Sequence, residues 1–443
     1  MSLSPEMEGL SLDQAPPLSI PMSFFVTAPL FLVIAGLVLL VNGSAVLTTP
    51  LLPITFGLAH LGTLGFLGVV MMGALYQMTP VVAVAPVRAI RLAHVVHFFL
   101  ATGILMLVLW SHQLIPPGMA HSAFGSIGLA VLVLAFTVGV ALAKSKTNSP
   151  SVAGMRFAVA CLVIVMLLGN WMSTSWYTTN FPGHRSYYVQ VHFTIAILGW
   201  VGGLLTAVAW QTLPMFYMTP EVSKTKAWSL FALIVVGVSG ALLVMIFSVF
   251  GFLENAGSEL AAIAALPAAF AVWIWHPKIV LTSLANRRRS RVDPSIKFWR
   301  VGMLMALPTF VCAGLAVFVT HQTWGPRFDL LFGWCAIFGW AGLIVHGMLT
   351  RIGPFLIWFH RFSPHIGRIP VPAMRRMIPD KLIEAGWKLH VLTLALGGGA
   401  ILTPMDGHFR TWLARSTGLL LLATGAVIAT YFKVLLGLKP ELK

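Results

Sequence analysis

Long apolar stretches alternate with short polar connections along the whole chain. A helix needs about 20 apolar residues to cross a bilayer, and twelve stretches approach or exceed that length. A membrane β-barrel would show short segments of alternating polarity, and the sequence lacks them. The pattern therefore predicts an all-α polytopic membrane protein. Its twelve transmembrane helices are expected at 23–41, 55–79, 90–110, 123–143, 154–172, 189–212, 228–250, 260–281, 300–320, 329–350, 387–404 and 413–437.

Composition and charge support this fold class. Only 9% of residues are charged, against about a quarter in soluble domains, which excludes a soluble protein. With a cytoplasmic N-terminus, 24 of the 28 Lys and Arg residues fall on the cytoplasmic side. The positive-inside rule then predicts a bacterial-type inner membrane protein with both termini cytoplasmic. The net charge of +16 thus predicts contact with membrane lipids and no nucleic-acid partner.

A related ten-residue phrase that contains a proline recurs three times. It reads GALYQMTPVV at 73–82, AVAWQTLPMF at 207–216 and GMLTRIGPFL at 347–356, and its prolines lie 134 and 140 residues apart. A repeat of this kind predicts architecture. We expect three four-helix arcs around a pseudo-threefold axis, in a single membrane domain. The glycines before each phrase predict close helix packing. The predicted repeats span residues 1–150, 151–297 and 298–443.

Histidines carry the candidate chemistry. His60 and His192 lie just inside the predicted outer ends of the second and sixth helices. Imidazole is a common ligand of haem iron and copper, and an unpaired imidazole is costly inside a bilayer. A helix-end histidine bonded to a backbone carbonyl, or one at the lipid interface, is the alternative. The predicted cofactor-binding residues are His60, His192, His94, His97, His346 and His390, with His60 and His192 also as metal ligands.

Two helices carry a family resemblance. AHLGTLGFLGVVMMGALYQMTP at 59–80 and VQVHFTIAILGWVGGLLTAVAWQTLPMF at 189–216 resemble helices of subunit I in the haem–copper oxidase and nitric oxide reductase superfamily. The chain also resembles the NnrS proteins, shorter relatives of that superfamily. The resemblance implies haem, with His60 as a ligand, and copper, with His192 in the place of a copper ligand. It also implies electron transfer or nitric oxide handling in a respiratory chain.

Departures from the family narrow that expectation. The seventh helix has no histidine, the tenth has no His-x-His, and Ala196 stands where the family's crosslinked tyrosine would be. We therefore expect a haem-binding redox protein without a complete oxygen-reducing centre. If it is an enzyme, it is an oxidoreductase, with a redox partner or additional membrane subunits. The alternatives are copper or haem transport and handling, or a cofactor-free structural subunit of a respiratory complex.

Two further features complete the sequence prediction. Cys161, Cys312 and Cys335 fall within predicted helices without partners at metal-ligand spacing, so we expect free packing residues. The connection at 351–386 is rich in Pro and basic residues. We expect it to lie on the membrane interface, with docking of a partner protein as the alternative.

Overall fold

The computed structural model describes residues 14–174, 185–253, 257–288, 293–319, 321–404 and 407–440. Within these residues, the regular structure is helical and contains no strand. The α-helices are α1 (Ser19–Asn42), α2 (Pro53–His60), α3 (Val69–Val82), α4 (Leu92–Ser111), α5 (Ala120–Leu134), α6 (Val140–Lys144), α7 (Pro150–Ser173), α8 (Arg185–Thr194), α9 (Gly203–Tyr217), α10 (Lys224–Val249), α11 (Gly257–Phe270), α12 (His276–Ala285), α13 (Pro294–Phe318), α14 (Gly325–Trp334), α15 (Leu343–Ile357), α16 (Asp380–Leu402) and α17 (His408–Gly437).

Consecutive helices join into twelve runs, within the described residues, that are long and apolar enough to cross a membrane. The predicted fold class is confirmed: the protein is an all-α, multi-pass membrane protein. The three cysteines are buried and none of them forms a disulfide, in line with the expectation that they are packing residues. The runs are Ser19–Leu47, Pro53–Val82, Leu92–Ser111, Pro117–Lys144, Pro150–Ser173, Tyr187–Tyr217, Lys224–Val249, Glu259–Ala285, Pro294–Phe318, Gly325–His365, Asp380–Leu402 and His408–Gly437.

The tenth run corrects one predicted boundary. It was expected to end at residue 350 and instead continues to His365, so the first part of the expected connection at 351–386 is helical. Pro354 lies inside this helix and does not end it. A proline removes only one backbone donor, and membrane helices tolerate this where neighbouring groups satisfy the freed carbonyl.

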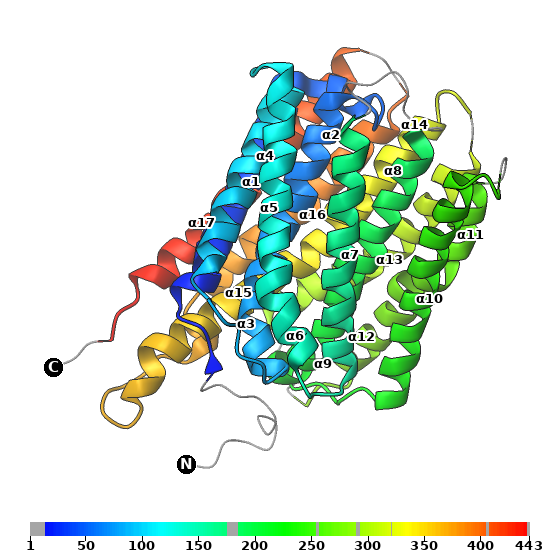
Figure 1. Ribbon diagram of the computed structural model, residues 1–443. Coiled ribbons are helices and arrows are strands. Elements are labelled where there is room, and N and C mark those ends of the chain that lie inside the picture. The colour runs from blue at the N-terminus through cyan, green and yellow to red at the C-terminus, as the bar shows by residue number, and fades with distance from the viewer. Residues whose placement is uncertain are drawn as a thin grey trace. The chain divides into compact units, whose positions relative to one another are not determined.

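The chain divides into two compact units, which are described separately. Unit 1 contains Leu75–Ser290 and Ala306–Gly325. Unit 2 contains Pro16–Ala74, Arg291–Met305 and Pro326–Lys443. In unit 1, α4 packs on α5 and α10 packs on α11, and in unit 2 the first helix, α1, packs along the last, α17 (Figure 1). The three arcs and their boundaries stay a prediction.

Wide π-helical turns recur inside the second, sixth and tenth runs. They are η4 (Leu61–Gly68), η8 (Ile195–Gly202) and η10 (Cys335–Gly342). Each begins 19 residues before the proline of its repeated phrase, Pro80, Pro214 or Pro354. The sequence repeat therefore extends to local backbone conformation. π-Helical turns are rare, and they are often found at functional sites.

Glycine brings helices into backbone contact within unit 2. A Cβ atom added to Gly36 of α1 would lie 2.6 Å from the carbonyl oxygen of Gly418 in α17, and the reverse substitution would meet Gly36 in the same way. Small residues at such crossings let membrane helices approach closely, where van der Waals contact stabilises them. The first and last helices are therefore held together through this glycine pair.

Replacing Gly418 with valine should lower the melting temperature of the detergent-solubilised protein. The added side chain would meet backbone rather than a movable side chain, and overpacking of this kind costs about 1–3 kcal/mol. Gly399→Ala is the matched control, because a Cβ there meets nothing within 4 Å. Thermal unfolding followed by circular dichroism checks the difference. Equal melting temperatures for the two variants would contradict the proposed crossing.

Candidate functional site

His60 ends α2, in unit 2, with its ring orientation fixed by its own helix. Pro53 occupies the first turn of α2, and the Thr55 hydroxyl donates to the carbonyl of Val46 at 2.8 Å, which anchors the helix start. His60 Nδ1 lies 2.9 Å from the carbonyl oxygen of Phe56, and the two rings are 4.1 Å apart. Because a carbonyl only accepts, Nδ1 carries the proton and Nε2 keeps its lone pair.

The bond to Phe56 is the one expected for the alternative, a helix-end histidine bonded to a backbone carbonyl, and it is also compatible with a metal ligand. A metal-binding histidine commonly donates its other ring N–H to a carbonyl, which fixes its tautomer. No hydrogen bond joins His60 Nε2 to another of the described residues. The ring belongs to a half-buried stripe of residues three or four positions apart. The stripe contains Phe56, His60, Thr63 and Leu64.

The glycines after His60 serve helix packing. A Cβ on Gly62 would lie 2.8 Å from the Ile337 side chain of η10, and one on Gly65 would lie 2.7 Å from Phe31 of α1. The prediction that glycines allow close helix packing is confirmed here. These positions are filled by protein, so they leave no space for a flat macrocycle. A ligand bound at His60 would use the half-buried stripe instead.

His192 lies in unit 1, on α8, with its ring Cε1 close to Gly169 of α7, where an added Cβ would stand 3.2 Å away. Alignment of the repeats on Pro80 and Pro214 pairs His60 with Thr194, so His192 precedes the equivalent position by two residues. Two residues turn an α-helix by about 200°. His60 and His192 therefore occupy different faces of corresponding helices, and their roles as cofactor and metal ligands stay predictions.

The other four predicted cofactor-binding histidines divide between the two units. His94 and His97 lie in the first turns of α4 in unit 1, where His94 is exposed and His97 is half-buried. His346 and His390 lie in unit 2, where both are fully buried and in contact. The structure thus brings His346 and His390 together. A site that combines all four residues stays a prediction.

A buried hydrogen-bonded chain links the last three membrane runs in unit 2. His390 Nε2 lies 3.0 Å from the carbonyl oxygen of Phe338, and the Nδ1 atoms of His390 and His346 are 3.0 Å apart. His346 Nε2 lies 3.3 Å from the Tyr431 hydroxyl. All four groups come from different elements, α16, η10, α15 and α17. We call His346, His390 and Tyr431 the buried triad.

The carbonyl at one end assigns the protons of the buried triad. Phe338 can only accept, so His390 donates from Nε2, and its Nδ1 accepts from His346 Nδ1–H. His346 Nε2 then accepts from the Tyr431 hydroxyl, whose single hydrogen is shared with the Leu382 carbonyl oxygen 3.4 Å away. Every ring nitrogen has a partner while both imidazoles stay neutral, which avoids a buried charge. In this arrangement neither His346 nor His390 offers a free lone pair to a metal.

Sequence reasoning missed the groups around the triad. A Cβ on Gly386 would lie 2.0 Å from the Tyr431 hydroxyl oxygen, so only glycine fits there. Arg351, 8% exposed, pairs with Asp293, and its Nε donates to the Ser295 hydroxyl at 3.0 Å. Arg351 stands inside the repeated phrase, which was the available signal. Tyr431 gave none, because its partner is 85 positions away.

His276 is a further buried histidine that the prediction left without a role. It begins α12 of unit 1, directly after the π-helical turn η9 (Ala271–Trp275). It is fully buried, neither ring nitrogen has a partner among the described residues, and the ring lies edge-on to Trp210 at 5.4 Å. An unpaired buried imidazole is costly, so His276 is a second candidate ligand.

The donor set distinguishes bare metal ions from a macrocycle. The described residues contain no group of three or more His, Cys, Asp or Glu placed to hold a metal ion. A porphyrin supplies the equatorial donors of its own iron, so one histidine is sufficient as an axial ligand. His60 fits that role. No protein-family model matches this chain, and no curated protein sequence matches it.

Proposed function

We propose that this protein is a haem-binding membrane redox protein in which His60 supplies an axial ligand. The observation that supports it best is the 2.9 Å separation between His60 Nδ1 and the Phe56 carbonyl oxygen, which assigns the proton to Nδ1 and leaves Nε2 available among the described residues. The half-buried stripe around His60 offers apolar contact to a macrocycle. Haem iron would supply one-electron transfer and, with an open sixth position, binding of a small gas such as nitric oxide.

The role of this chain's own residues is positioning. Phe56 orients the imidazole through its carbonyl and packs on the ring, while Gly62 and Gly65 fix the helix against η10 and α1. The proposal names no copper ligands, because a copper ion needs several protein donors and the described residues contain no group of three or more His, Cys, Asp or Glu placed to hold one. The proposal also includes a redox partner or additional membrane subunits, because a redox protein must exchange electrons with another component.

The visible spectrum of the purified protein tests the proposal. We expect a Soret band that shifts on reduction with dithionite, with about one haem per chain and no stoichiometric copper by metal analysis. A colourless protein, purified from cells supplied with haem precursor, would contradict the proposal and favour a cofactor-free structural role. Stoichiometric copper without haem would favour copper handling.

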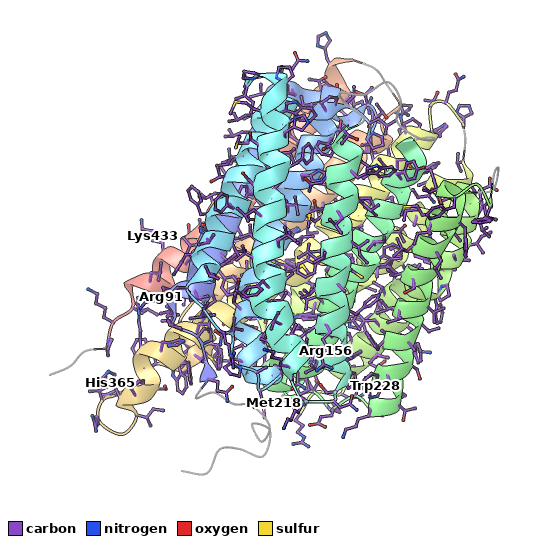
Figure 2. The ribbon with its side chains drawn as sticks, viewed as in Figure 1. Arg91, Arg156, Met218, Trp228, His365 and Lys433 are labelled. Carbon is purple, nitrogen blue, oxygen red and sulfur yellow. The ribbon has the colours of Figure 1, made fainter. Side chains whose placement is uncertain are left out.

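The proposal includes a bacterial-type inner membrane location with both termini cytoplasmic. The partition of Lys and Arg supports it. Within unit 1, Arg156, Met218 and Trp228 lie at the same end of the helices (Figure 2). This end includes the turn before α10, where Lys224 and Lys226 are exposed.

Reporter fusions test that orientation. Alkaline phosphatase fused after Lys146 or after Asn286 should be inactive, while green fluorescent protein at the same positions should fluoresce. Both positions follow helices that end on the predicted cytoplasmic side. A fusion after Gln113, which follows α4, is the control and should give the opposite pattern. Active phosphatase at Lys146 would refute the orientation.

A further inference from the structure

The tenth membrane run is too long for the bilayer. Gly325–His365 contains 41 residues, which corresponds to about 60 Å of helix at ~1.5 Å per residue. The hydrocarbon core is only about 30 Å thick. Modest tilt cannot absorb a twofold excess, so part of this run lies outside the hydrocarbon. The end at His365 carries Arg361 and leads into Arg368, Arg375 and Arg376, and it is the end that we place at the membrane surface.

Around that end the chain folds back on itself into a small, ordered substructure. It turns at Gly367, which has a positive φ of 81°, and returns so that η13 (Met374–Arg376) contacts α15. Phe362 and Ile378 are buried beneath it. Arg361 donates to the carbonyl oxygens of Leu436 and Leu438, each at 2.8 Å, which ties the structure to the end of α17. We call residues 358–379 the basic lobe.

The basic lobe combines cations with exposed apolar side chains. It contains four arginines and no Asp or Glu. Arg361 is bonded to the two carbonyls at the end of α17. Arg368, Arg375 and Arg376 form no side-chain hydrogen bond or ion pair among the described residues. Ile366 is 46% exposed at the turn. Figure 2 shows His365 on this loop, beyond the end of α15.

We propose that the basic lobe binds anionic phospholipid headgroups of the bilayer that holds the protein. Three unpaired guanidinium groups can each form paired hydrogen bonds to phosphate oxygens. Clusters of Lys and Arg directly beside a membrane helix are attracted to anionic lipid, and an apolar side chain such as Ile366 can enter the interface. This function is independent of any cofactor bound at His60.

A dye at the tip of the lobe measures this contact. Ile366→Cys can be labelled selectively with a polarity-sensitive fluorophore, because the three natural cysteines are buried. The full-length protein is placed in nanodiscs of phosphatidylcholine with or without phosphatidylglycerol. We expect a blue shift in emission that grows with the phosphatidylglycerol content. Emission typical of water at every composition would overturn the proposal.

A charge variant separates headgroup binding from simple proximity. Each basic residue near an anionic surface increases affinity about fivefold. The triple variant should therefore bind short-chain phosphatidylglycerol on the order of 100-fold more weakly. It combines Arg368→Gln, Arg375→Gln and Arg376→Gln. The control removes three exposed charges from unit 1, through Lys144→Gln, Lys146→Gln and Lys224→Gln. It should change the dye titration by less than about fivefold. Equal effects of the two triple variants, or no effect of the lobe variant, would refute a dedicated headgroup site and leave a protein partner as the occupant.

Discussion

Replacing His60 with alanine should remove most of the haem from the purified protein. The imidazole is the proposed haem ligand, and among the described residues its side chain bonds only to a carbonyl of its own helix. Its loss should therefore leave the fold intact while the iron loses its protein ligand. We expect the haem-to-protein ratio to fall at least tenfold, because even the loss of a group that only supports a metal ligand costs about 10–100-fold in metal affinity. Pyridine haemochrome quantification measures the ratio, and circular dichroism confirms the fold.

Two controls make this result specific to ligation. His408→Ala removes an exposed histidine from α17 of the same unit and should keep the haem. Imidazole added to His60→Ala should restore part of the Soret band, since a free ligand can occupy the vacated position. A merely structural role would not respond to imidazole. Full haem occupancy in His60→Ala would reject the assignment and make His276 the next ligand to test.

The spin state then reports on His192. If His60 is the sole protein ligand, His192→Ala should leave the spectrum unchanged. If His192 provides a second ligand, the native protein should be low-spin and this variant should become high-spin. Electron paramagnetic resonance of the oxidised protein distinguishes the two cases.

Breaking the buried triad should be the most destabilising change for the fold itself. His390→Leu removes the hydrogen bond to the Phe338 carbonyl and leaves His346 Nδ1–H without this partner. A lost hydrogen bond costs about 1 kcal/mol and an unpaired buried donor about 1–3 kcal/mol. We expect a total loss of about 2–4 kcal/mol in unfolding free energy. Tyr431→Phe removes a single hydroxyl and should cost about 1 kcal/mol.

A double-mutant cycle tests whether the triad acts as a unit. In the variant with both His346→Leu and His390→Leu, the unpaired Nδ1–H no longer exists, so the loss should be smaller than the sum of the single losses. The expected coupling is about 0.5–3 kcal/mol. Thermal unfolding of the detergent-solubilised variants measures it. Strict additivity would show that the two imidazoles do not support each other.

The number of membrane helices could be predicted because apolar length alone determines it. The bounds were less accurate where polar residues belong to a helix, as in the extension from Arg351 to His365. There the sequence resembles a loop, because it is rich in Pro and basic residues. The helix persists because the buried Arg351 is paired with Asp293 and Arg361 has carbonyl partners at the end of α17. Such partners lie far away in sequence.

The candidate residues were predictable as a set but their partners were not. The sequence singled out His346 and His390 by type and depth. Their contact depends on how α15 and α16 are rotated about their axes, and their link to Tyr431 depends on the absence of a side chain at Gly386. The sequence also could not show that the His60 side chain would bond to the carbonyl of Phe56. Every residue in a helix has a carbonyl four positions before it, so this spacing does not single out His60.

The wide turns η4, η8 and η10 have a consequence for how these helices are numbered on a helical wheel. Each π-type bond closes between residues i and i+5, so one such ring takes up an extra residue and shifts the following part of the helix by about 100°. A wheel drawn from Val82 back to Pro53 with a uniform angle would place His60 on the wrong side. Each wide turn therefore acts like a one-residue insertion. It rotates the side chains on one side of the turn about the helix axis, while those on the other side keep their directions.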